Sequence, residues 1–386
     1  MGTVTQFIVF VSIVFSVYGL MNYYVCRKIL LQTHFPTGVN AAIIAFLILM
    51  VVSPFICRIG MFRRMDGFHY GLTLVSSLWM GVLFYLLILN AGVDLVNALG
   101  RLIGWIIPGT SPNDVISPGY PIFFIILIVT SGICTYGYFE ALNIGVSRVT
   151  IETHKLPRGV DRVTIAQISD VHLGVLVGES RLKKIARIIE ELHPDILIST
   201  GDLVDENLDS MDYLAEELKS IRPRLGKYAI TGNHEFYAGL ERSVRFTEDS
   251  GFIMLRNQYA NVHGIINLIG LDDPTAKNFN DNSGEGIPTL FSRCDPELFT
   301  ILLRHQPRAF KKNASSMPMD LQLSGHTHKG QIFPFNLLTH ILFPLQGGFF
   351  EVDGKKLYSS RGTGTWGPPL RFLSPPEIVI IELRKL

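Results

Sequence analysis

The stretch Arg162–His172, RVTIAQISDVH, contains the pattern that recurs through the second half of the chain. Its β-rich first part, residues 162–169, predicts a strand. Two residues that can bind a metal, Asp170 and His172, follow this strand directly. Residues i and i+2 of an extended chain point to the same face, so we expect both side chains to reach one ion. Alone, Asp-x-His is equally compatible with the polar start of a loop.

The same arrangement follows the next predicted strand, 195–200 (DILIST). Asp202 comes directly after it, and Asp205 lies three residues further on. The ends of neighbouring parallel strands face one crevice, so these groups should lie near Asp170. A carboxylate has two oxygens, and Asp202 is therefore well suited to bridge two ions. Asp205 either orients a neighbouring histidine or caps a helix.

Three later strands are each followed by a block of possible ligands. The strands are 227–231, 299–303 and 321–324, and the blocks are Asn233-His234-Glu235, His305 and His326-Thr327-His328. An Asn carbonyl is a sensible ligand beside a shared carboxylate, and His234 suits a ligand or an acid. In isolation, His305 would equally suit the core or the surface. Oxygen and imidazole ligands without thiolate favour Mn²⁺, Fe²⁺ or Zn²⁺. Two such ions side by side can hydrolyse phosphate esters.

Amphipathic helices are expected between the early strands, and mostly strands later. The predicted helices are 179–192, 209–221 and 240–250, and the further strands are 252–255, 265–271, 356–360 and 378–383. Residues 272–288, rich in Asp, Asn, Gly and Pro, predict an irregular loop. This order predicts an α/β domain of two packed sheets flanked by helices.

The first part of the chain is much more apolar than the second. Hydrophobic residues make up 48% of the 386 residues, and the mean hydropathy is +0.31. Four windows are long enough to cross a bilayer: 4–25, 39–57, 70–90 and 122–142. We therefore predict a membrane region, 1–146, followed by a soluble domain, 147–386. The net charge of +1 gives no indication of a nucleic-acid partner.

The distribution of Lys and Arg predicts how the chain is oriented in the cell membrane. With four spans, two basic groups share one side: Arg58, Arg63 and Arg64, then Arg148, Lys155 and Arg158. This bias favours a multi-pass protein with both termini and the soluble domain in the cytoplasm. One span more or fewer would reverse the side on which the soluble domain lies.

The complete ordered set resembles the calcineurin-like metallophosphoesterase superfamily, with its pattern D-x-H, G-D-x-x-D, G-N-H-[DE], H, G-H-x-H. Every element occurs here in order, over roughly 162–383. The surroundings of His305 and His328, and the segment 360–369 (SRGTGTWGPP), are similar to the YkuE-like bacterial branch. That branch often has a secretion signal or a single anchor, so four spans depart from it. The resemblance implies a four-layer αββα sandwich.

The resemblance also implies roles for the ligand blocks. One divalent ion would be held by Asp170, His172, Asp202 and His328, and the other by Asp202, Asn233, His305 and His326. A hydroxide bridging the two ions, which are Mn, Fe or Zn, would attack phosphorus. His234 would be the general acid, and Asp205 would orient it.

The expected activity is hydrolysis of phosphodiester, phosphomonoester or pyrophosphate bonds by a membrane-anchored enzyme. A lipid-linked substrate is attractive at a bilayer, and a glycolipid such as a UDP-diacylglucosamine would meet an anchored site there. A non-catalytic metal-binding scaffold is the alternative from another class. Arg361, Arg371 and Trp366 are candidates for phosphate contact and ring stacking, and each could instead serve in surface packing.

Overall fold

The computed structural model describes residues 3–60, 67–107, 113–205, 211–281, 283–308 and 310–386. The chain forms two compact units, Met1–Tyr136 and Gly137–Leu386. The first unit consists of helices, and the second is built around sheets.

The helices of the first unit are long and apolar. They are α1 (Thr3–Gln32), α2 (Thr37–Gly60), α3 (Gly67–Ile106) and the greater part of α4 (Tyr120–Leu142). Among the described residues, α3, α4 and the segment Thr37–Cys57 of α2 are long and apolar enough to cross a membrane. The fourth expected window, 4–25, lies in α1, and its crossing stays a prediction, as does the orientation. Arg63 and Arg64, used in that prediction, lie outside the described residues.

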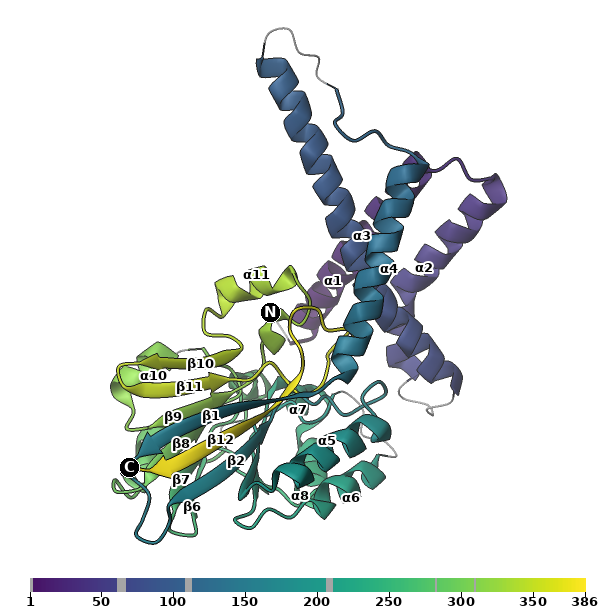
Figure 1. Cartoon of the computed structure of the whole chain (residues 1–386). Coiled ribbons are helices and arrows are strands. Elements are labelled where there is room, and N and C mark those ends of the chain that lie inside the picture. The colour runs from purple at the N-terminus through teal and green to yellow at the C-terminus, as the bar shows by residue number, and fades with distance from the viewer. Residues whose placement is uncertain (1–2, 61–66, 108–112, 206–210, 282, 309) are drawn as a thin grey trace. The chain divides into compact units, whose positions relative to one another are not determined.

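The second unit contains two six-stranded mixed sheets (Figure 1). The first has the order β1-β12-β2-β3-β4-β5, and all neighbours except β12 and β2 are parallel. Its strands are β1 (Gly145–Thr153), β12 (Glu377–Lys385), β2 (Arg162–Ile168), β3 (Ile196–Ser199), β4 (Lys227–Ala229) and β5 (Ile253–Met254). The sequence did not predict β1, a strand whose residues are mostly exposed.

The second sheet has the order β10-β11-β9-β8-β7-β6. Its central pairs, from β11 to β7, are parallel, and its two outer pairs are antiparallel. The strands are β10 (Gly348–Val352), β11 (Lys355–Ser359), β9 (Leu321–Ser324), β8 (Phe299–Leu303), β7 (Ile266–Gly270) and β6 (Gln258–Val262). The sequence predicted neither β6 nor β10.

Strand periodicity assigns the buried side chains to two cores. Along β2, Val163 and Ile165 join the cluster between the two sheets, which also contains Ile301 and Leu323. Ile168 points the opposite way, into a cluster with the helices outside the first sheet. Each such fully buried aliphatic side chain stabilises the fold by about 1.5–3 kcal/mol.

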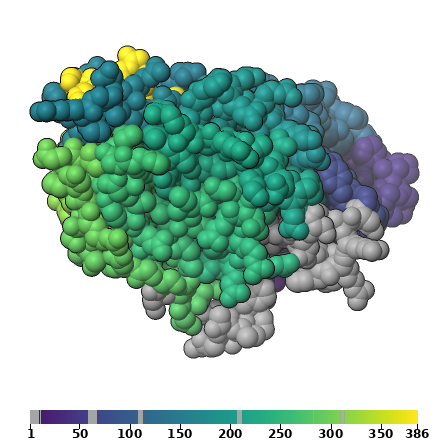
Figure 2. Space-filling view, turned by 90° about the horizontal axis from the view of Figure 1, so that it is seen from below, coloured from purple at the N-terminus to yellow at the C-terminus, as the bar shows by residue number. Residues whose placement is uncertain are grey.

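Helices cover the outer face of each sheet and complete four layers, as expected (Figure 1). The first sheet is covered by α5 (Glu179–Leu192), α6 (Asp212–Ser220) and α8 (Leu240–Asp249). Residues of α9 (Ile287–Ser292) and α10 (Phe310–Ser316) pack with the outer side of the second. Figure 2 shows one face of this unit, on which atoms from its first part, in teal, adjoin atoms from its middle part, in green.

Short helices occupy segments between strands. They are α7 (Asn233–Tyr237), the 3₁₀ helices η1 (Pro274–Phe279) and η2 (His328–Gly330), and α11 (Phe335–Leu342). The expectation of an irregular loop over 272–288 was therefore wrong in part, because η1 lies within it and α9 begins in it. At the start of η1, the carboxylate of Asp273 accepts a hydrogen bond from the backbone N–H of Thr275, which caps the turn.

Candidate metal centre

The proposed ligands follow the carboxyl ends of β2, β3, β4, β8 and β9; most lie in loops, while Asn233 begins α7 and His328 begins η2. Five of them have left-handed backbones, with φ of 51° at Asp170, 54° at His172, 52° at Asp202, 71° at His326 and 47° at His328. The expectation that Asp170 and His172 reach one ion from extended chain was therefore wrong in its geometry. A non-glycine residue in this conformation costs roughly 1–2 kcal/mol, so the surrounding structure must hold these loops in place.

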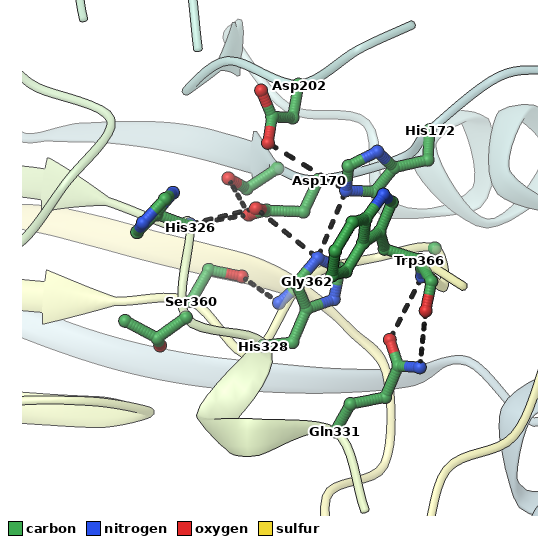
Figure 3. Close-up of polar contacts among 12 residues, drawn as sticks. Asp170, His172, Asp202, His326, His328, Gln331, Ser360, Gly362 and Trp366 are labelled. Carbon is green, nitrogen blue, oxygen red and sulfur yellow. Dashed lines mark hydrogen bonds and ion pairs between the residues drawn. The ribbon is translucent and has the colours of Figure 1, made fainter. Parts of the chain in front are cut away.

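One group of possible ligands consists of Asp170, His172 and His328, whose ligand atoms all lie within 4.8 Å of one another. Nε2 of His172 is 3.1 Å from Nε2 of His328, and the latter is 3.6 Å from Oδ1 of Asp170. Figure 3 shows these three side chains close together, Asp170 and His172 from one segment and His328 from another. The structure thus brings together residues that are up to 158 positions apart (170 to 328).

A second group consists of Asp202, His305 and His326, again within 4.8 Å of one another. Nδ1 of His326 is 3.2 Å from Nε2 of His305, which is 3.2 Å from Oδ2 of Asp202. The same Oδ2 lies 3.9 Å from Nε2 of His172. Asp202 therefore stands between the two groups, where a bridging carboxylate has to be.

The donor atoms fit two divalent ions. Two atoms bound to one ion at about 2.1 Å each lie roughly 3.0–3.4 Å apart, which matches the separations between the paired ring nitrogens. Oδ1 of Asn233 is buried and accepts no hydrogen bond from any described residue. A buried carbonyl oxygen without a donor is costly unless a cation takes the donor's place. The donor set, of imidazole nitrogen and oxygen only, suits Mn²⁺, Fe²⁺ or Zn²⁺.

The ligand loops are hydrogen-bonded to one another. Asp170 accepts a hydrogen bond from the backbone N–H of His326 at 2.8 Å, and Asp202 accepts one from that of His234 at 2.9 Å. The buried carboxylate of Glu235 accepts from the backbone N–H groups of Asp202, Leu203 and Gly232. In the sequence Glu235 was recognised only as part of a ligand block, although its place three residues after Gly232 is that of a capping-box glutamate.

Glycine is required at two points where these loops meet. A Cβ atom at Gly325 would lie 1.9 Å from Oγ of Ser169 and 2.2 Å from Oδ2 of Asp170. A Cβ atom at Gly232 would lie 2.2 Å from Oδ1 of Asp202. Both separations are far below van der Waals contact. The glycine that opens each of these two blocks therefore lets the backbone approach a ligand carboxylate.

The ligand histidines differ in the charge that their surroundings favour. Nδ1 of His305 is 2.8 Å from the carbonyl oxygen of Thr200; the oxygen can only accept, so Nδ1 carries a proton and Nε2 is the atom available to an ion. Burial lowers the pKa of His305, but the charges of Asp202 and Asp170 outweigh burial and raise the pKa well above its ordinary value. Burial, with the nearby His305 ring, lowers the pKa of His326 to about 4. Burial, with the Arg371 guanidinium, holds the pKa of His328 well below its ordinary value.

His234 lies beside both groups. Its ring makes an edge-to-face contact with that of His172, with centroids 4.6 Å apart. Its Nδ1 is 3.0 Å from Oδ1 of Asp205, but the ring is not aligned for a hydrogen bond. Burial lowers the pKa of His234, yet the charges of Asp202 and Asp205 outweigh burial and raise the pKa to about 9. These carboxylate charges favour the protonated imidazole.

Trp366 forms an exposed wall next to His234. Its indole is 53% exposed, and its ring centroid is 5.7 Å from that of His234. The side chain of Gln331 accepts a hydrogen bond from the backbone N–H of Trp366 and donates one to its carbonyl (Figure 3). This fixed backbone leaves the indole exposed beside His234, and its stacking role stays a prediction.

Arg361 and Arg371 do not face the site as phosphate contacts. Arg361 pairs with the buried carboxylate of Glu377. Arg371 is fully buried, and it donates to the backbone carbonyls of His328 at 3.1 Å and Arg361 at 2.7 Å. Its Nη2 also lies 2.9 Å from Nδ1 of His328. Arg371 therefore supports the loop that carries His328, a role that no local sequence pattern indicates.

We expect Arg371→Met to destabilise the protein by about 3–5 kcal/mol, the scale for removing one member of a buried charged network. The carbonyls that the guanidinium satisfies would remain buried without a donor. Thermal unfolding of the full-length protein in detergent measures the effect, and Arg384→Met on the exposed pair with Glu382 is the matched control. Equal melting temperatures for the two variants would contradict this role.

Comparisons with known proteins identify the family of the second unit. The calcineurin-like phosphoesterase family model matches residues 163–330. An uncharacterized metallophosphoesterase of Aquifex aeolicus is 38% identical over 251 residues, which cover 64% of this chain and 95% of the relative. A transmembrane protein with metallophosphoesterase domain of Danio rerio is 32% identical, over 89% of this chain and 80% of the relative. YkuE of Bacillus subtilis, an uncharacterized metallophosphoesterase, is 34% identical over 64% of this chain and 90% of the relative.

The four-layer fold and the clustered ligands define a metal-dependent phosphoester hydrolase. The chain belongs to the calcineurin-like metallophosphoesterase family, as its sequence predicted, and it has YkuE among its relatives.

Proposed function

We propose that this chain is a membrane-anchored, dimetal phosphoesterase that cleaves phosphodiester or pyrophosphate bonds at a bilayer surface. The observation that carries the proposal is the position of Asp202, whose Oδ2 lies 3.2 Å from His305 and 3.9 Å from His172. One carboxylate oxygen is thus within reach of both ligand groups. Two ions joined in this way are the arrangement used for in-line displacement at phosphorus.

The proposed ligand sets are those of the motif. Asp170, His172, Asp202 and His328 would hold one ion, and Asp202, Asn233, His305 and His326 the other. When bound, the two ions supply a hydroxide at neutral pH and offset negative charge on the phosphoryl oxygens.

His234 is the proposed general acid. The leaving oxygen of a phosphoester acquires negative charge as its bond to phosphorus breaks, and a proton from His234 neutralises it. Asp205 holds the imidazole from the other side, 3.0 Å from its Nδ1, and keeps it protonated. Burial opposes the charge on Asp205, but His172 and His234 outweigh burial, so the pKa of Asp205 is below its ordinary value. It therefore stays ionised as a positioning residue.

The substrate class follows from the anchor. The segments long and apolar enough to span, and the transmembrane relatives, support an enzyme that works beside lipid. We therefore favour a lipid-linked phosphoester, of which the glycolipid pyrophosphate considered from the sequence is one example. The proposed topology remains multi-pass, with the catalytic domain in the cytoplasm.

A metal-exchange assay tests this function. We expect the full-length protein in detergent to contain about two ions per chain, to lose turnover of bis(p-nitrophenyl) phosphate in chelator, and to regain it with Mn²⁺. A protein that binds two ions without turnover of phosphodiester, pyrophosphate or phosphomonoester probes is a scaffold, and the proposed activity is then wrong.

A further inference from the structure

The helix α11 exposes its apolar side chains. Its sequence is FNLLTHIL, and none of its residues is buried. Five of its side chains are large, apolar and between 42% and 75% exposed: Phe335, Leu337, Leu338, Ile341 and Leu342. At 100° per residue these five cover one continuous face of about 160°, which we call the α11 apolar face. Contiguous exposed apolar surface of this kind marks an interaction site.

The polar side of α11 lies toward the domain, the reverse of a surface helix in a water-soluble protein. The backbone of Asn336 lies against Gly330, where a Cβ atom would be 2.3 Å from Cα of Asn336. The carbonyl of Asn336 accepts hydrogen bonds from Thr339 and Gln346. Anchored on this side, the helix directs its apolar face outward.

Charge around the helix indicates what covers this face. No Asp, Glu, Lys or Arg occurs between residues 332 and 350. Two basic side chains lie at its ends: Arg308, whose guanidinium is 4.5 Å from the ring centroid of Phe343, and Lys329, which lies against Gly347. An apolar face with a basic rim matches the acyl boundary and anionic headgroups of a bilayer.

A segment long and apolar enough to span a bilayer lies directly before β1 in the sequence. The helix α4, one of the segments long and apolar enough to span, ends at Leu142, and only Asn143 and Ile144 separate it from β1. A helix of eight residues is about 12 Å long and too short to cross the hydrocarbon. In contact with a bilayer, such a helix lies in the interface, with its apolar face toward the acyl chains.

The helix is tied to the proposed metal centre at both ends. It follows η2, which begins at His328, after four residues. Beyond its other end, the ring of Phe343 makes an edge-to-face contact with that of His326, with centroids 5.3 Å apart. Whatever surface contacts α11 therefore also lies close to His326 and His328.

We propose that α11 inserts its apolar face into the headgroup–acyl boundary and so places the site at the bilayer surface, facing lipid-linked phosphoesters. The bilayer contact rests on α11 alone, whereas the access to substrate rests on the proposed function.

Fluorescence quenching tests the contact without any use of activity. The full-length protein, with its four cysteines replaced by serine, is placed in nanodiscs of phosphatidylcholine and phosphatidylglycerol. A bimane is attached at Ile341→Cys or, as the control, at Tyr213→Cys, an exposed site on α6. We expect doxyl-labelled lipid to quench the probe at 341 and aqueous iodide to quench only the probe at 213.

Two outcomes would overturn the proposal. Equal quenching by iodide at both positions would show that α11 faces water. Protection from iodide at 341 without quenching by doxyl lipid would show that protein covers the face, either another part of this chain or a second copy.

An activity comparison tests the access to substrate. We expect Ile341→Glu to lower turnover of a diacylglycerol p-nitrophenyl phosphodiester in nanodiscs by at least about tenfold, because an acidic side chain at membrane depth is unfavourable. Turnover of bis(p-nitrophenyl) phosphate in detergent should not change, and Tyr213→Glu should alter neither. Equal losses on both substrates would contradict the access route, and absence of turnover in the unaltered protein would contradict the proposed function instead.

Discussion

We expect Asp202→Asn to lower kcat/KM for bis(p-nitrophenyl) phosphate on the order of 10³-fold, the scale for removing one preorganised charge-stabilising group. The amide keeps the size of the carboxylate, and its oxygen can still accept from the backbone of His234. Its NH₂, however, would face Nε2 of His305, where Oδ2 lies now at 3.2 Å. An NH₂ group has no lone pair to offer an ion, so the link between the ligand groups is lost.

Metal content provides the second measurement for Asp202→Asn. We expect the metal content to fall from about two ions per chain to about one, because the two ions share the ligand that is removed. Asp249→Asn, on the exposed surface of α8, is the matched control and should keep both the ions and the activity. Full metal content with near-normal turnover in Asp202→Asn would refute the bridging role.

The second large effect concerns His234. We expect His234→Ala to lower kcat by about 10²- to 10⁴-fold for a diester with an alkyl leaving group, the usual contribution of a general acid. With p-nitrophenolate, which needs no proton to leave, the loss should be far smaller. His263→Ala, on the turn between β6 and β7, is the control. Equal losses of kcat on the two substrates would assign His234 to charge stabilisation in the transition state and not to proton donation.

The pH dependence of the activity tests whether His234 acts as a general acid. A general acid acts while protonated, so activity should fall as pH rises through the pKa of His234. That pKa is about 9 with the full charges of Asp202 and Asp205. Ions bound to Asp202 offset part of its charge and bring the alkaline limb below pH 9. In Asp205→Asn the second carboxylate is gone, and the limb should move further toward low pH; an unmoved limb would exclude Asp205 from this role.

The sequence predicted the fold where its signals are local. The buried strands β2, β3, β8 and β9 are short apolar runs, and a polar block follows each, so strand and loop were both evident. The helix α5 was predicted to the residue from its apolar spacing. The exposed strand β1 has no apolar run, and its pairing with β12 is a tertiary property.

The candidate site was predictable as a set of residues and not as a geometry. Motif order identified the ligand blocks, and the structure brings their Asp and His residues together in three overlapping groups, one of which consists of His172, Asp205 and His234. The left-handed backbone of Asp170 and His172 was not foreseen, because short-range patterns favour extended chain after a strand. The supports Glu235 and Arg371 were missed for a related reason: their partners are distant backbone groups.

The left-handed ligand residues show where this sequence accepts backbone strain. Strain alone would favour glycine at Asp170, His172, Asp202, His326 and His328, since only glycine adopts these φ values without penalty. A chain with glycine there would be free of this strain, but it would have lost five of its seven proposed ligands and the hydrogen bonds that two of them accept from neighbouring loops. At these positions the residues that the proposed metal site requires are present at the cost of backbone strain.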